Sequence, residues 1–254
     1  MGTVRKPFQG IMNILRFNWH LYLIAAGFIF FLYLISYILI EPYLMINYVL
    51  QGLIVSSTLI SLFVSLYIYD LAGLYEFRWL SELSVAAECK VVNINAGFDE
   101  TSAFLQQRFS EAKLSVFDFY DPLKHTEVSI KRARKAYLPF DGTLAISTSS
   151  LPLPDNHADY IFLIFSAHEI RNQGERTIFF NELRRIIKPN GKIILLEHLR
   201  DINNFCAYNI GFFHFLSKSS WFNTFRHSDL RVVQQTKFTP FITRFMLEKN
   251  GSPS

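Results

Sequence analysis

The sequence contains little cysteine and only modest net charge. Cys89 and Cys206 are the only cysteines among 254 residues, which argues against a disulfide framework and against a cysteine-based metal site. A reducing compartment fits that composition. The formal charge is +4, so no nucleic-acid partner is indicated, although contact of a basic patch with anionic lipid stays open.

Charge is also nearly absent from one long stretch of the chain. Leu21–Ile40 and Tyr48–Tyr69 contain no charged residue, and as helices both are long enough to span the ~30 Å hydrocarbon core of a bilayer. Glu41-Pro42 begins a tight turn between them. The pattern predicts a two-helix transmembrane hairpin over residues 21–69, with the lipid bilayer as a partner.

Basic residues predict the orientation of this hairpin. Arg5, Lys6 and Arg16 precede the first apolar stretch, and the turn contains neither Lys nor Arg. The positive-inside rule then predicts that residues 1–20 are a cytosolic segment and that both termini and the soluble domain lie in the cytosol. A signal peptide is not expected, because the first stretch is too long and a second one follows.

Small residues recur on the second apolar stretch, at Ser57, Ser61 and Ser65. Small residues let a neighbouring helix approach closely and hydrogen-bond across the contact. Two interpretations stay open, ordinary packing within the hairpin and a homo-oligomer contact.

Beyond the hairpin, residues 70–89 are predicted to form an amphipathic linker helix at or near the bilayer surface, because apolar residues recur there near helical spacing. Strand-like and helix-like runs then alternate, which indicates a mainly parallel sheet with covering helices. Two final strand-like runs around Thr239-Pro240 predict a closing antiparallel hairpin. Residues 250–254 are predicted to be a disordered tail. The predicted strands are Lys90–Ile94, Leu114–Phe117, Leu144–Ser147, Tyr160–Phe165, Lys192–Glu197, Leu230–Phe238 and Ile242–Glu248, and the predicted helices are Thr101–Ser110, Pro122–Ala136 and Thr177–Ile187.

The stretch VVNINAGFDETSAFLQQRF predicts a strand, a turn around Gly97 and a helix. It resembles the first motif of class I S-adenosylmethionine (SAM) dependent methyltransferases, whose glycine-rich loop reads hh(D/E)hGxGxG. Asn93 stands where the acid usually is, and Asn95 and Asp99 replace the outer glycines. Asp118 ends the next strand, where an acid can accept both ribose hydroxyls of an adenosine group. The resemblance implies SAM as cofactor, bound by Asn93, Asn95, Ala96, Gly97, Phe98, Asp99, Asp118, Phe119, Ser147 and Ser166.

A second block, Leu151 to Asp201, resembles the fourth and fifth sheet motifs of the same family. It contains a Leu-Pro-x-Pro-Asp turn, an Asp that opens the fourth strand, and a helix that leads through a Lys-Pro-x-Gly turn into the fifth strand. The resemblance implies an α/β fold over residues 90–249, with a Rossmann-like methyltransferase sheet and a C-terminal antiparallel hairpin, preceded by the transmembrane hairpin.

Candidate catalytic residues follow the fourth and fifth strands, since ligands bind at the carboxyl ends of strands in open α/β sheets. They are His168, Glu169, Glu197 and His198. His168 or Glu197 is either a general base or a hydrogen-bonding group behind the site. Together with His214 these side chains could ligate a metal. No tight spacing supports such a site, and none is predicted.

The function expected from these features is methyl transfer from SAM to a lipophilic small-molecule acceptor, such as a quinone, an isoprenoid or polyene, or a lipid headgroup. Eight aromatic residues between Phe205 and Phe225 suit such an acceptor, although half of them are expected in the core. The alternative is an inactive scaffold or regulator that keeps the fold. A nicotinamide-dependent oxidoreductase fits poorly, because no G-x-G-x-x-G follows the first strand. The basic helix at Pro122–Ala136 is either a solvated face or a contact for anionic headgroups or substrate.

Overall fold

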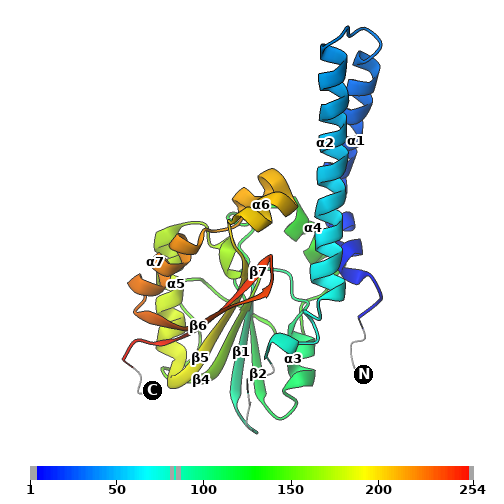
Figure 1. The fold of residues 1–254 in the computed structure, drawn as a ribbon. Coiled ribbons are helices and arrows are strands. Elements are labelled where there is room, and N and C mark those ends of the chain that lie inside the picture. The colour runs from blue at the N-terminus through cyan, green and yellow to red at the C-terminus, as the bar shows by residue number, and fades with distance from the viewer. Residues whose placement is uncertain (1–4, 81–82, 84–86, 252–254) are drawn as a thin grey trace.

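The computed structural model describes residues 5–80, 83 and 87–251. Two antiparallel helices stand out from the remainder of the molecule (Figure 1). Helix α1 spans Gln9–Ile35 and α2 spans Tyr43–Leu66, after which a π-helical turn continues to Leu71. Both helices are long and apolar enough to cross a bilayer.

Helix α1 begins well before the apolar stretch that the sequence marks. Residues 9–20, predicted as a separate cytosolic segment, form its first turns. Asp70 accepts hydrogen bonds from the backbone N–H groups of Gly10 and Ile11, both at 2.8 Å. These amides lack partners within the helix, so a carboxylate from the far end of the hairpin stabilises the helix start. Asn18 then interrupts the helix with non-helical dihedral angles (φ −113°, ψ 16°).

The linker after the hairpin is not one helix. Its described residues up to Leu80 form turns and a short 3₁₀ segment, Arg78–Leu80. Gly73 has a φ of +74° and Phe77 one of +51°, which a continuous right-handed helix does not contain. Leu74 is buried in the core, so the helical spacing marks core contacts. The predicted helix over 70–89 is wrong in this part; residues 81, 82 and 84–86 of it lie outside the described residues.

A seven-stranded sheet forms the body of the domain, in the order β3-β2-β1-β4-β5-β7-β6. The first five strands are parallel, and β7 pairs antiparallel with both β5 and β6. The predicted parallel sheet with a closing antiparallel hairpin is therefore confirmed. The strands are β1 (Lys90–Asn95), β2 (Lys113–Asp118), β3 (Leu144–Ala145), β4 (Ala158–Ile164), β5 (Ile187–His198), β6 (Leu230–Thr239) and β7 (Ile242–Lys249).

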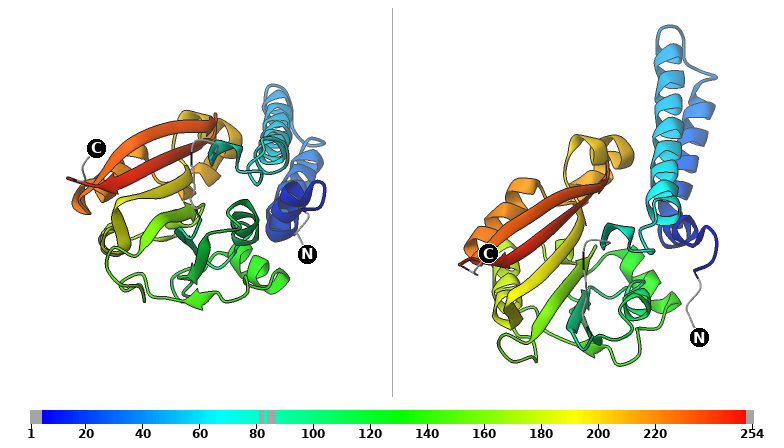
Figure 2. Two further views of the ribbon diagram at one scale, coloured as in Figure 1. Left: turned by 90° about the horizontal axis from the view of Figure 1, so that it is seen from below. Right: turned by 60° about the horizontal axis from the view of Figure 1, so that its bottom comes forward.

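Helices cover both faces of this sheet (Figure 2). Phe179 and Trp221 pack beneath Leu195 on one face, whereas Leu105 packs with Ile194 on the other. This alternation follows from the two-residue period of a strand. Burial of each such side chain contributes about 1.5–3 kcal/mol. The helices are α3 (Ser102–Arg108), α4 (Val128–Ala136), α5 (Gln173–Ile186), α6 (Ile202–Tyr208) and α7 (Lys218–His227).

Three predicted elements are shorter than expected, and α3 loses residues at both ends of the predicted Thr101–Ser110. Helix α4 starts at Val128 rather than Pro122, because Asp121 accepts from the Leu123 N–H within a local turn and does not cap the helix. Strand β3 ends at Ala145 and leaves Ser147 in the turn that follows.

The base of the hairpin is fixed to the domain by buried polar contacts. The carboxylate of Glu100, after β1, accepts hydrogen bonds from Asn13 at 2.9 Å and from the Tyr75 hydroxyl at 2.8 Å. Burial raises the pKa of Glu100, although the nearby Arg5 guanidinium opposes that shift. Arg132 of α4 donates to the carbonyl of Phe17 at 2.6 Å. The hairpin therefore sits on the carboxyl edge of the sheet.

Candidate functional site

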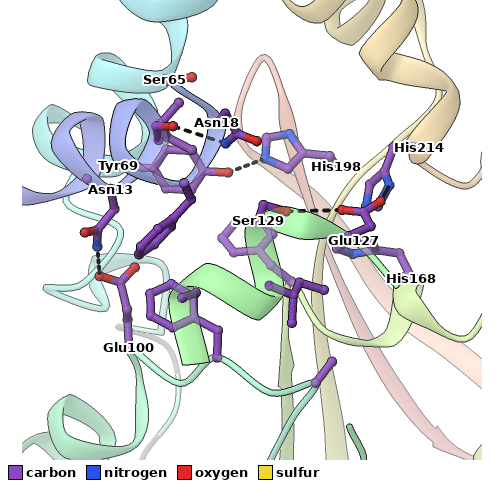
Figure 3. A pocket seen from close by; sticks show the side chains of 18 of the residues that line it. Asn13, Asn18, Ser65, Tyr69, Glu100, Glu127, Ser129, His168, His198 and His214 are labelled. Carbon is purple, nitrogen blue, oxygen red and sulfur yellow. Dashed lines mark hydrogen bonds and ion pairs between the residues drawn. The ribbon is translucent and has the colours of Figure 1, made fainter. Parts of the chain in front are cut away.

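A cavity of about 450 Å³ lies between the carboxyl edge of the sheet and the base of the hairpin. Figure 3 shows that its walls come from both parts of the chain. Asn95, Ala96 and Phe98 contribute the loop after β1, whereas Leu21 and Ser65 contribute the two apolar helices. A ligand in this cavity would contact both.

Side chains brace the loop after β1 where a glycine-rich motif would have glycines. Gly97 has a φ of +95°, a left-handed conformation that favours glycine. Asn95 Oδ1 accepts a hydrogen bond from the Gly97 N–H at 3.1 Å. Asp99 Oδ1 accepts from the N–H groups of Thr101 and Ser102, both at 2.9 Å. The two substitutions therefore hold the turn and the start of α3.

Asp118 at the end of β2 faces a narrow cleft of about 40 Å³ next to this loop. Its Oδ2 pairs with Arg134 at 2.5 Å, and its Oδ1 accepts from the Tyr120 N–H at 2.8 Å. The Arg134 guanidinium also stacks over the Tyr120 ring, 4.3 Å from the ring centroid. Both side chains approach the position of a Cβ on Gly97, with a Tyr120 ring carbon at 2.8 Å and the Arg134 Cδ at 3.1 Å.

His168 lies between two carboxylates at the polar end of the cavity. Its Nδ1 is 2.6 Å from Glu197 and its Nε2 is 3.2 Å from Glu169. Burial disfavours the charged ring, but the two carboxylates outweigh it and raise the pKa of His168 to about 10. Burial acts against ionisation of Glu169 as well, yet the hydrogen bonds from His168 and His214 lower its pKa. The raised pKa favours the protonated ring at neutral pH, which disfavours His168 as a general base.

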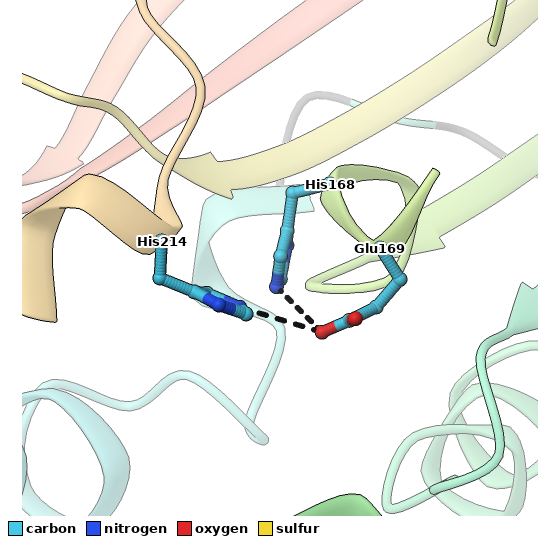
Figure 4. Close-up of side chains that lie close together, drawn as sticks. All are labelled: His168, Glu169 and His214. Atoms are coloured by element: carbon cyan, nitrogen blue, oxygen red, sulfur yellow. Dashed lines mark ion pairs between the residues drawn. The ribbon is translucent and has the colours of Figure 1, made fainter. Parts of the chain in front are cut away.

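His214 approaches the same carboxylate from the other side (Figure 4). Its Nε2 is 3.4 Å from Glu169 and its Nδ1 is 2.5 Å from Glu127, which precedes α4. Arg171 packs against the His214 ring, donates to its carbonyl oxygen and lies 3.7 Å from Glu127. The ligand atoms of His168, Glu169 and His214 all lie within 4.8 Å of one another.

His198, at the end of β5, joins the domain to the hairpin. Its Nδ1 donates to Asn204 Oδ1 at 3.0 Å, because the amide nitrogen of Asn204 already donates elsewhere. Its Nε2 is therefore the acceptor for the Tyr69 hydroxyl at 3.1 Å. The ring is sandwiched between Phe165 and Phe215, with centroids 5.2 Å and 4.7 Å away. This burial lowers the pKa of His198 to about 4.

The structure places most predicted site residues around the cavity or the adjoining cleft. Three candidate catalytic side chains, His168, Glu169 and His198, line the cavity. Glu197 is fully buried behind His168 and is absent from the cavity wall, so it does not meet an acceptor directly. The predicted cofactor residues at the cavity or the cleft are Asn93, Asn95, Ala96, Gly97, Phe98, Asp99 and Asp118.

Three predicted cofactor residues lie elsewhere. Ser147 is exposed and contacts Ser149 at 2.9 Å, because β3 ends before it. Phe119 is buried in the core beside Phe179. Ser166 donates to the Ile94 carbonyl at 2.8 Å and so joins β1 to the end of β4. None of the three lines the cavity or the cleft, and their contact with the cofactor stays a prediction.

Several side chains of the site are not predicted from the sequence. Asn13 and Glu100 form one wall, and Glu127 and Tyr69 contact the histidines. Asn13 is a polar residue shortly before the apolar stretch, and that position could have indicated a role at the membrane end of the site. Glu127 carries no local signal, because its partner His214 is distant in sequence.

Comparisons with known proteins agree with this geometry. Residues 92–195 match the family model of the methyltransferase domain. The ubiquinone/menaquinone biosynthesis C-methyltransferase of Cupriavidus necator is 38% identical over 47 residues, a match that covers 18% of this chain and 18% of that protein. A chain in the methyltransferase activator complex from Haloferax volcanii superposes with a TM-score of 0.51 at 14% identity, covering 70% of this chain and 90% of its own. A SAM-dependent methyltransferase from Aquifex aeolicus gives a TM-score of 0.49 at 18% identity, over 70% and 93% of the two chains.

Residues 92–195 are therefore a methyltransferase domain, and SAM is its cofactor. The residues present fit that group. Gly97 has the left-handed φ of a glycine loop, and Asp99 Oδ2 is buried with no hydrogen-bond partner among the described residues. Asp118 stands where a carboxylate would hold the ribose. Arg134 pairs with Asp118 here, and its side chain is 38% exposed.

Proposed function

We propose that this chain is a membrane-anchored methyltransferase that moves the methyl group of SAM to a lipophilic acceptor at the cytosolic face. In this proposal α1 and α2 cross the bilayer, and both termini lie in the cytosol. The observation that carries the proposal is the composition of the cavity wall, because the loop after β1 and the two apolar helices line one space.

The hairpin side of that wall suits an acceptor dissolved in lipid. Leu21, Tyr22, Ser61 and Ser65 line the cavity from helices that also expose apolar side chains such as Ile24 and Phe63. A substrate that partitions into the bilayer would meet the tethered enzyme at high effective concentration. Two of the three serines in the small-residue stripe thus face the enzyme's own cavity, which favours packing within the chain over an oligomer contact.

The segment after β5 also supports contact with lipid. Helix α6 and the turn that follows lie on the same side of the domain as the hairpin (Figure 1). Ile202, Ile210 and Phe213 expose 60–82% of their surface there. Exposed apolar side chains gathered beside a proposed membrane anchor are typical of a membrane contact.

Methyl transfer from SAM requires the protein mainly to align the reacting atoms. The sulfonium of SAM supplies an activated methyl group, so the chain must place the acceptor atom in line with it and exclude water. The walls around Phe98 and Phe165 can do both for a ring or a polyene. Of the acceptor classes, a quinone ring has added support, since one similar protein is named a quinone biosynthesis C-methyltransferase.

The test is a reconstitution of the full chain in lipid vesicles with methyl-labelled SAM and membrane lipid extract. The expected result is label in the lipid phase and formation of S-adenosylhomocysteine, both abolished by Phe98→Asp, which places a charge in the cavity wall. The control is Leu123→Asp, which adds the same charge at a residue that is 88% exposed and does not line the cavity. This variant should keep the activity of the wild type. SAM binding without transfer to any lipid fraction would contradict the proposal.

The alternative is a non-catalytic scaffold, and the Arg134–Asp118 ion pair favours it, because that pair occupies the carboxylate expected to hold the ribose. Calorimetry separates the two functions. The scaffold predicts no measurable SAM binding to the full chain in detergent, whereas the enzyme predicts binding that Asp118→Ala abolishes.

A further inference from the structure

We propose that His168, Glu169 and His214 bind a divalent zinc ion at the polar end of the cavity, through His168 Nε2, His214 Nε2 and the Glu169 carboxylate. Two histidines and one carboxylate are an established ligand set for catalytic zinc, which leaves a fourth position for a small molecule. The proposal concerns a site that methyl transfer from SAM does not itself require.

The spacing of the three ligand atoms suits a tetrahedral ion. Ligands at 2.0–2.1 Å from zinc in tetrahedral geometry are about 3.3 Å apart from one another. Glu169 Oε1 is 3.2 Å from His168 Nε2 and 3.4 Å from His214 Nε2. The backbone brings these atoms together from the end of β4 and from the segment before α7, and both histidines point their Nε2 atoms at the carboxylate (Figure 4).

The second nitrogen of each histidine is oriented as metal sites require. Metal-bound histidines almost always donate their other ring N–H to a carboxylate, a carbonyl or water, which fixes the tautomer. His168 Nδ1 is 2.6 Å from Glu197, and His214 Nδ1 is 2.5 Å from Glu127. Glu127 is in turn paired with Arg171. Two independent carboxylates thus contact the Nδ1 atoms of the two rings, and the Arg171 guanidinium lies 3.0 Å from His214 Nε2, where the ion would displace it.

The charge of the cluster also favours a cation. Three carboxylates, those of Glu127, Glu169 and Glu197, surround the two rings against one guanidinium, that of Arg171, and the two that contact His168 are buried. Carboxylates that are taken out of water need a positive partner.

The site faces the proposed acceptor space. His168, Glu169 and His214 all line the cavity, so the fourth position of the ion would be open to a ligand there. An acceptor that binds through an oxygen or sulfur atom fits that position, since zinc accepts both. Zinc is also redox-inert, which matches a transfer in which nothing is oxidised.

The experiment measures metal directly. The full chain, purified in detergent without a histidine tag, is stripped with a chelator, dialysed against zinc and analysed by mass spectrometry for metal content. We expect about one zinc per chain, and loss of that zinc in His214→Ala and Glu169→Gln. His227→Ala is the matched control, because His227 is an exposed histidine whose ring hydrogen-bonds the Asn223 carbonyl of its own helix and does not line the cavity. Replacement with cobalt should give the visible absorption of a tetrahedral site in the wild type and in the control alone.

Glu127→Gln tests the same site while leaving all three ligands in place. We expect about 10–100-fold weaker zinc binding in a titration, as for other carboxylates behind metal-bound histidines. Zinc content near zero, or equal in wild type, His214→Ala and Glu169→Gln, would overturn the proposal. SAM binding measured on the same samples keeps this outcome separate from failure of the proposed function.

Discussion

Acidification should loosen the joint between hairpin and domain through His198. The ring is 3% exposed, and its burial between Phe165 and Phe215 lowers its pKa from 6.5 to about 4. The unfolded chain therefore binds a proton below pH 6.5 that the folded chain takes up only near pH 4. The stability that neutral His198 contributes is complete above pH 6.5 and is lost as the pH falls from 6.5 to about 4.

The size of the effect follows from linkage. A shift of about 2.5 pKa units corresponds to ~3 kcal/mol over the whole window, and to ~2 kcal/mol between pH 7.5 and pH 5. For a chain of this length that corresponds to a fall of about 4–8 °C in the midpoint of thermal unfolding. Protonation would also remove the acceptor of the Tyr69 hydroxyl, so the loss should centre on the base of the hairpin.

The assay compares thermal unfolding of wild type and His198→Gln in detergent at pH 7.5 and pH 5. Glutamine offers a donor and an acceptor but does not titrate. His168 has a raised pKa and gains stability as the pH falls towards 6.5, so only the difference between variants isolates His198. We expect His198→Gln to lose about 4–8 °C less than wild type between the two pH values. Equal losses in both proteins would refute the assignment.

Three further predictions concern single side chains. Asp118→Asn should weaken SAM binding about 10–100-fold in calorimetry, because hydrogen bonds to a charged group contribute about 1.5–3 kcal/mol, whereas Asp121→Asn keeps its turn and should bind normally. Gly10→Ala should destabilise the chain by about 1–3 kcal/mol in denaturant unfolding, since its Cβ would lie 2.4 Å from Tyr69 Cβ, whereas Gly27→Ala, with nothing within 4 Å, should not. Asn95→Ala should reduce SAM affinity because it frees the Gly97 turn, and Ser147→Ala should leave affinity unchanged; a reversed order would restore Ser147 to the site.

The fold could be predicted from the sequence because its signals are local. Apolar runs with a two-residue or a helical period mark β1, β4 and α5, and the turns between them carry proline or glycine. The linker shows where the same signal fails. Leu71 and Leu74 have helical spacing, yet Gly73 and Phe77 take left-handed conformations, and Leu74 and Leu80 pack into the core from turns. Tertiary burial there outweighs local propensity.

The site was predicted only in part because its contacts join distant segments. Asn95, Asp118 and His168 lie at or just after the carboxyl ends of parallel strands. Because these ends meet at one edge of the sheet, the sequence is enough to predict that the three residues share that edge. Two other pairs, His214 with Glu127 and Arg134 with Asp118, form only through tertiary packing. They depend on how α4 and the segment before α7 pack against that edge. Nothing in the local pattern encodes such a pairing.

The hairpin cannot be separated from the site without changing it. Hydrogen bonds join Asp70 to the first turn of α1, Glu100 to Asn13, and Tyr69 to His198. The base of the hairpin therefore forms one wall of the cavity. A protein cut at residue 70 would expose the Glu100 carboxylate and the His198 ring to water and would open the cavity to solvent. The burial that lowers the pKa of His198 would then be lost. Assays of methyl transfer, zinc binding and pH dependence must therefore use the full chain, because the soluble domain alone presents different electrostatics and no apolar wall.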